Sequence, residues 1–211
     1  MDSAALQLTH WLSPAFPTGA FAYSHGLEQV IAQGAVSDAA SLEHWLSDVL
    51  HHGAGWQDGV LLALALEPGA DLDTLDAMAQ ALQPSAERLQ ESTEQGAAFA
   101  RTVARITARP LPPRALPIAV AEAARPLNPD PAQVIALYLQ GFATNLVTIA
   151  IRHVPLGQGE GHAVLARLLP PITALAARAA RAGMEDLGTA CLGADIAAMD
   201  HETKEVRLFR T

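Results

Sequence analysis

Residues 38–52, DAASLEHWLSDVLHH, carry the clearest periodic pattern in this chain of 211 residues. Leu42, Trp45, Leu46 and Val49 follow the i, i+3, i+4, i+7 spacing that places side chains on one face of an α-helix. An acidic residue at the start of the segment complements the helix dipole. The segment therefore predicts an amphipathic helix whose apolar face packs against a core.

The sequence on either side repeats this helical character. No stretch alternates Val, Ile and Thr with polar residues between turn signals, as a β-strand would. Asp130 and Pro131 are typical of a helix start, and Pro84 is expected in the first turn of another long helix. We expect helices over residues 3–12, 24–33, 38–52, 58–66, 71–82, 84–108, 115–124, 130–153, 160–182 and 187–199. The connections between them are short, which favours one all-α, single-domain helical bundle of roughly eight to ten helices.

We expect this bundle to occupy residues 1–199 and a charged tail to occupy residues 200–211. The tail alternates charged residues with Val206, Leu208 and Phe209. Arginine and aromatic residues are typical anchors of protein interfaces, so the tail is a candidate partner-binding segment. A tail that packs on its own domain is an equally good interpretation of this composition.

The charge balance excludes several classes of partner. The chain has 13 Lys and Arg residues against 22 Asp and Glu residues, and its formal net charge is -9. Binding to nucleic acid or to an anionic membrane would need a basic face, so we expect neither. The single cysteine, Cys191, excludes a disulfide within one chain. The N-terminus lacks the basic start of a secretory signal, and we expect a cytoplasmic protein.

The sequence lacks the common signatures of catalysis. It contains no phosphate-binding P-loop, no dinucleotide fingerprint and no nucleophile elbow. Its acidic residues gather at helix starts, where capping explains them without acid–base chemistry. We therefore expect no enzymatic activity, no catalytic residues and no bound cofactor.

A metal-binding protein is the alternative hypothesis. His44, Asp48, His51 and His52 recur at one-turn spacing on the face opposite the apolar residues of the 38–52 helix. Imidazole and carboxylate groups at this spacing can hold zinc or nickel. Such spacings also arise by chance on a solvated polar face, which is the interpretation we favour.

Residues 13–28, SPAFPTGAFAYSHGLE, form the most distinctive loop. Pro14 and Pro17 restrict the backbone, while Gly19 permits conformations that other residues avoid. A rigid loop that carries aromatic residues suits a recognition surface, because little entropy is lost on binding. A buried tight turn explains the same composition equally well.

These segments resemble the UreF family of urease accessory proteins. The family pattern Ser-Pro-x-x-Pro-x-Gly-x-Phe-x-Tyr-Ser-x-Gly-Leu-Glu is matched by Ser13, Pro14, Pro17, Gly19, Phe21, Tyr23, Ser24, Gly26, Leu27 and Glu28. Further matches lie at Glu91, Gln95, Gly96, Leu116, Pro117 and residues 145–158, 195–197, 201–203 and 207–210. The chain departs from the family at Ala97 and Asp200, where arginine is expected, and at residues 204–206, where Gln-Tyr-Ser is expected.

The resemblance implies an all-α homodimer that works as a scaffold without catalytic residues. It implies assembly with UreD (also called UreH) and the GTPase UreG on apo-urease, so that nickel can enter the urease active site. It also implies that the tail and the region of Tyr23 contact partners. The partner-binding residues expected from it are Pro14, Pro17, Phe21, Tyr23, Glu28, His201, Glu202, Arg207, Leu208, Phe209 and Arg210.

Overall fold

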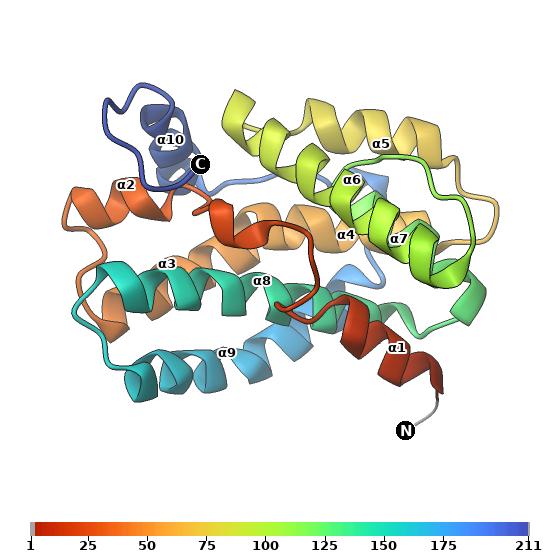
Figure 1. Cartoon of the computed structure of the whole chain (residues 1–211), viewed down its shortest axis with the longest axis horizontal. Coiled ribbons are helices and arrows are strands. Elements are labelled where there is room, and N and C mark those ends of the chain that lie inside the picture. The colour runs from red at the N-terminus through yellow and green to blue at the C-terminus, as the bar shows by residue number, and fades with distance from the viewer. Residues whose placement is uncertain (1–2, 211) are drawn as a thin grey trace.

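The computed structural model describes residues 3–210, and every regular element in that range is a helix (Figure 1). This confirms the predicted all-α class. The helices are α1 (Ser3–Trp11), α2 (Leu27–Ala32), α3 (Ala39–His52), α4 (Ala54–Leu66), α5 (Leu72–Ala81), α6 (Ala86–Thr107), α7 (Leu116–Ala124), α8 (Pro131–His153), α9 (Gln158–Ala179) and α10 (Leu192–His201). Short 3-10 turns span Ala20–Ala22, Arg125–Leu127 and Met184–Asp186.

Helix α4 forms the centre of the bundle. It lies between α5, α6 and α7 on one side and α8 and α9 on the other (Figure 1). Its side chains are buried on every face, including the fully enclosed Leu61 and Leu62. Across from it, Ile135 and Leu139 of α8 are fully buried as well. Burial of this continuous apolar core is the main force that holds the helices together.

The predicted helix starts agree with the structure at Asp38 and Asp130, where an acidic side chain caps the helix. The Asp38 carboxylate accepts a hydrogen bond from the Ser41 backbone N–H at 2.8 Å, and the Asp38 N–H donates to the Ser41 hydroxyl at 3.1 Å. Asp130 accepts from the Ala132 N–H at 3.2 Å, directly before Pro131. These caps satisfy backbone N–H groups that have no partner inside the helix.

Other predicted boundaries were wrong for physical reasons. The helix expected from residue 24 begins at Leu27, because His25 and Gly26 have φ values of 58° and 78° that no α-helix permits. The helix expected from Pro84 begins at Ala86, because Ser85 caps it by accepting from the Arg88 N–H.

The last helix was expected over residues 187–199 and instead spans α10, Leu192–His201. Residues 187–191, which precede it, are not helical, and among them the Ala190 N–H donates to the carbonyl of His52, the last residue of α3, at 2.7 Å. Two residues at the start of the predicted tail are therefore helical.

Helix α8 is long and apolar enough to cross a membrane by length and composition alone. Of its most apolar window, 56% is buried inside the protein, as is usual for a core helix. The segment between α1 and α2 crosses the front of α8 (Figure 1). There the Asn145 amide donates to the Ala20 carbonyl at 3.1 Å and fixes the loop to the helix.

The start of α7 packs directly on the backbone of α6. A side chain at Gly96 would place its Cβ 2.7 Å from the backbone nitrogen of Leu116, in a space already filled by the chain before α7. Gly96 therefore allows these two helices to approach closely. This contact positions α6, which carries the acidic residues Glu87 and Glu94 of the surface described below.

We predict that Gly96→Ala lowers the free energy of unfolding by roughly 1–3 kcal/mol, because the added methyl group forces the backbone apart. Urea denaturation followed by circular dichroism measures this. Gly159→Ala is the matched control in α9, because nothing lies within 4 Å of the position that its added methyl group would occupy. Equal unfolding midpoints for the two variants would contradict the close approach of α6 and α7.

Candidate partner-binding surface

The carboxylate of Glu28 on α2 holds the C-terminal tail. Lys204 Nζ donates to it at 2.8 Å, and the backbone N–H groups of Leu208 and Phe209 donate at 3.1 Å and 2.9 Å. His201 Nε2 lies 3.1 Å from the same carboxylate. Four donors from one segment thus converge on one buried side chain, and the tail folds back over α2 (Figure 1).

These donors determine the ionisation of Glu28. Burial alone would raise the pKa of this carboxyl group. The hydrogen bonds from Lys204, His201 and the backbone of Phe209 and Leu208 outweigh burial and lower the pKa to about 2. Glu28 is therefore ionised at neutral pH, and its charge is balanced by the tail.

A second acidic residue, Glu87 of α6, completes the pairing of His201. The Nδ1 atom of this fully buried imidazole lies 2.7 Å from the Glu87 carboxylate, opposite its contact with Glu28. A doubly protonated ring can donate to both carboxylates. Arg207 Nη1 also donates to Glu87, at 2.5 Å, and the Glu202 carboxylate accepts from the Glu87 backbone N–H at 3.1 Å.

Tyr23 connects the N-terminal loop to the end of the tail. Its hydroxyl donates to Glu94 of α6, and Arg210 Nη1 donates to the Tyr23 oxygen at 3.2 Å and to Glu94 at 2.6 Å. The Arg210 backbone N–H donates to the Ala22 carbonyl at 2.8 Å. Burial, together with the bond to Glu94, raises the pKa of Tyr23, so the hydroxyl stays protonated at neutral pH.

A buried ion pair on α6 lies close to the residues that hold the tail. Arg88 and Glu91 of α6 pair with each other, and His25 Nδ1 lies 3.7 Å from Glu91. Burial and the nearby Arg88 charge lower the pKa of His25 to about 4, so its ring is neutral at pH 7. Next to it, a Cβ on Gly26 would stand 3.1 Å from the Ala198 backbone nitrogen. Glycine at this position therefore lets α2 approach α10 closely.

Apart from Phe209, which packs against the core, the tail and α10 turn their large apolar side chains outward. Ala194, Ala197 and Ala198 form the buried face of α10. The opposite face exposes Leu192, Ile196 and Met199 at 71%, 54% and 46%. In the tail, Val206 and Leu208 are also exposed. We call these five exposed residues the α10–tail patch; an exposed apolar patch of this kind is typical of a protein interaction site.

The structure brings most of the predicted partner-binding residues together. Those that meet around the tail are Tyr23, Glu28, His201, Glu202, Arg207, Leu208, Phe209 and Arg210. Tyr23, Glu28 and His201 are buried and bond to groups of the tail or of α6. Phe21 is exposed beside them on the same loop.

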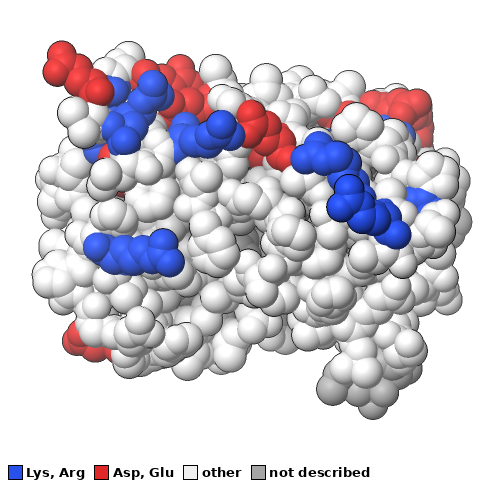
Figure 2. All heavy atoms as spheres, viewed as in Figure 1, with Lys and Arg blue, Asp and Glu red and all other residues white. Residues whose placement is uncertain are grey.

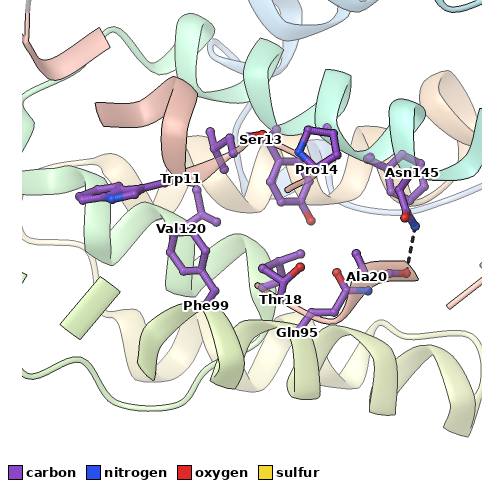
Figure 3. A pocket seen from close by; sticks show the side chains of 14 residues that line it. Trp11, Ser13, Pro14, Thr18, Ala20, Gln95, Phe99, Val120 and Asn145 are labelled. Atoms are coloured by element: carbon purple, nitrogen blue, oxygen red, sulfur yellow. Dashed lines mark hydrogen bonds between the residues drawn. The ribbon is translucent and has the colours of Figure 1, made fainter. Parts of the chain in front are cut away.

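Pro14 lies apart from this group, whereas Pro17 borders it. Pro14 lines a cavity of about 80 Å³ between the N-terminal loop, α6, α7 and α8 (Figure 3). Phe99 and Gln95 reach it from α6 and Asn145 from α8 (Figure 3). This volume is far below the roughly 300–1,000 Å³ of typical small-ligand pockets. Pro17 is exposed and lines a groove that Tyr23 and Arg210 also line.

Sequence reasoning missed Glu87 and Glu94 as partners of the tail, and Lys204 as a tail residue that binds Glu28. No local pattern reveals that α6 lies beside it. It also missed the outward face of α10, although Leu192, Ile196 and Met199 have helical spacing, because such spacing is usually that of a core face.

The histidine face of α3 does not assemble a metal site. His44 Nε2 lies 3.6 Å from Asp48 on the exposed surface, while His51 Nδ1 lies 2.9 Å from the Ser47 backbone carbonyl. Among residues 3–210, no three His, Cys, Asp or Glu side chains are placed to hold a metal ion. The metal-binding alternative is therefore not favoured.

We predict that Glu28→Gln lowers the free energy of unfolding by about 3 kcal/mol at pH 7. The fall in the pKa of Glu28 from 4.5 to about 2 corresponds to a stabilisation of this size. Because the folded pKa is depressed, the stabilisation is complete above pH 4.5 and is lost as the pH falls toward 2. The difference between variant and wild type should therefore shrink over this range in urea denaturation.

Glu205→Gln is the matched control, since it removes the same charge from an exposed position in the tail. It should change stability little at any pH. Burial raises the pKa of Asp58 to about 6, so its contribution to the free energy of unfolding changes with pH in the opposite direction. This contribution is the same in the wild type and in both variants, so it cancels when they are compared. A pH-independent difference between Glu28→Gln and wild type would refute the assigned role of the charge.

Comparison with known proteins identifies the family of this chain. A model of the UreF family matches residues 36–169. Proteins named urease accessory protein UreF are 58% identical in Cereibacter sphaeroides, over the full length of both chains, and 52% identical in Paracoccus denitrificans, over the whole chain and 97% of that relative. The relative of that name in Roseobacter denitrificans is 50% identical over 99% of this chain and 94% of its own length. The chain therefore belongs to the UreF family of urease accessory proteins.

Proposed function

We propose that this chain is a non-enzymatic scaffold for urease maturation in the cytoplasm. In this role it assembles with UreD (UreH) and the GTPase UreG on apo-urease and enables GTP-dependent nickel insertion. Membership of the UreF family supports the general role. The specific partners rest on the family resemblance and on the surface described above.

The α10–tail patch is the observation that carries the proposal. Its apolar side chains are turned away from the core while the polar groups of the tail are bonded inward to Glu28, Glu87 and Glu94. A surface fixed in this way loses little conformational entropy when a partner binds. We assign this patch to UreD.

We also propose that the chain forms a homodimer through the face seen in Figure 2. Charged side chains there gather along the upper edge, over α6 and the tail, while the surface over α1 and much of α8 is largely free of them (Figure 2). Leu6 of α1 is 56% exposed. Depletion of charge at the centre is characteristic of protein interfaces.

A scaffold without a nucleotide site can still influence GTP hydrolysis by its partner. It needs only to bind one nucleotide state of UreG more tightly than the other, because such a difference shifts the equilibrium between the states. No catalytic residue of this chain is required for that coupling.

We predict that Ile196→Glu weakens co-purification with UreD by at least about tenfold, because a charge in the centre of an apolar contact must be desolvated. Affinity pull-down of tagged UreD with titrated amounts of this chain measures the effect. Before the partners are added, light scattering on the wild-type chain should give twice its mass of 22.1 kDa.

Leu169→Glu is the matched control, because Leu169 is 42% exposed on α9, outside the patch. It should leave UreD binding unchanged. If Ile196→Glu and Leu169→Glu bind UreD equally well, the patch is not the UreD site. If the wild-type chain fails to co-purify with UreD and UreG at all, the scaffold proposal itself is wrong.

A further inference from the structure

A trough runs along α6 on the side that faces the N-terminal loop. Its first part, of about 480 Å³, lies between Pro17–Gly19 and Tyr23 on one wall and α6 on the other, with Ala97 and Ala98 as its floor. Its second part, of about 200 Å³, continues past Pro17 between Phe16 and Ile106. Pro17 lines both parts, so they follow one another along the helix.

The first part of the trough is bordered by arginine. Arg101 lines it, and Arg105 lies one turn further along the same exposed face of α6. Among the described residues, neither has a carboxylate within 4 Å, whereas most other basic side chains are paired with acids or with carbonyl groups. Figure 2 shows basic side chains in a row over the lower half of α6.

Arg210 closes the other end of this part. Its bonds to Tyr23 and Glu94 both use Nη1, so the N–H groups on Nε and Nη2 have no partner among residues 3–210. Glu94 is itself occupied, because it also accepts from Gln90 Nε2 at 2.7 Å. The trough therefore offers guanidinium donors at both ends of its first part, in a protein whose net charge is -9.

The second part is smaller and mainly apolar. Ile106 is 52% exposed there beside Ala15, although isoleucine usually lies in a core. From Glu94 to Ile106 the helix rises by roughly 18 Å, which an extended chain covers in about five or six residues. The small floor residues Ala97 and Ala98 leave room for a backbone to lie against α6.

We propose that this trough binds an extended acidic segment of a partner protein, with carboxylates on Arg101 and Arg210 and an apolar side chain next to Ile106. Charge complementarity selects the acidic segment, and the apolar end sets its position along α6. The proposal stands apart from the urease role, because it concerns a surface outside the α10–tail patch and is tested on the isolated chain.

The probe is a fluorescein-labelled peptide of sequence Leu-Asp-Ser-Asp-Ser-Asp-Leu, titrated with the full chain and followed by fluorescence anisotropy. The same peptide with asparagine in place of aspartate is the neutral control. We expect the acidic peptide to bind more tightly than the neutral one, despite the overall negative charge of the protein. Added salt should weaken the acidic peptide more.

Two variants locate the binding. Arg101→Glu replaces attraction by repulsion and should weaken binding of the acidic peptide about tenfold. Arg181→Glu is an equal charge change at an exposed residue outside the trough, and it should change binding of this peptide less than twofold. Ala97→Phe fills the floor without changing charge and should weaken both peptides. Circular dichroism checks that each variant remains folded.

The proposal is overturned if the wild-type chain binds the neutral peptide as tightly as the acidic one. It is also overturned if Arg101→Glu and Arg181→Glu weaken peptide binding equally, because the peptide would then respond only to the net charge of the protein. Unchanged binding by Ala97→Phe would show that the peptide lies elsewhere. None of these results bears on UreD binding at the α10–tail patch.

Discussion

A buried carboxylate needs hydrogen-bond donors, and the C-terminal tail supplies them to Glu28. Removing one partner of a buried ion pair commonly costs about 3–5 kcal/mol, which is a large part of the stability of a small domain. Lys204, His201 and two backbone N–H groups meet this demand together. The tail is thereby held on α2, while Glu87 and Glu94 of α6 fix it further along its course.

The outward character of this surface follows from the same constraint. Once the polar groups of the tail are bonded inward, Val206 and Leu208 remain on the outside. In α10 the large apolar side chains are exposed for a different reason, which is the size of the residues. Only its small alanine face fits closely against Gly26, so the larger side chains point away from the bundle. A region whose apolar groups cannot be buried within the chain is suited to bury them against another protein.

The sequence predicted local features well and long-range pairings poorly. The periodic residues of α3 and the caps at Asp38 and Asp130 depend on neighbours a few positions away, so their patterns could be read directly. His25 and Gly26 have positive φ values, and Gly26 lies against the backbone of α10, a long-range contact that no local pattern reveals. Likewise, the sequence analysis predicted a helix near α10 but not its exposed apolar face. The family pattern identified Glu28 and His201, whereas their common neighbour Glu87 emerged only from the fold.

Hydrogen exchange at the backbone amides of Leu208 and Phe209, resolved by NMR, tests most directly whether Glu28 holds the tail. Both N–H groups donate to this buried carboxylate, so they should exchange far more slowly than free amides. In Glu28→Gln the two amides should lose this protection while those of the core helix α8 keep theirs. Exchange of Leu208 and Phe209 at the rate of an unstructured peptide in the wild-type protein would contradict the account.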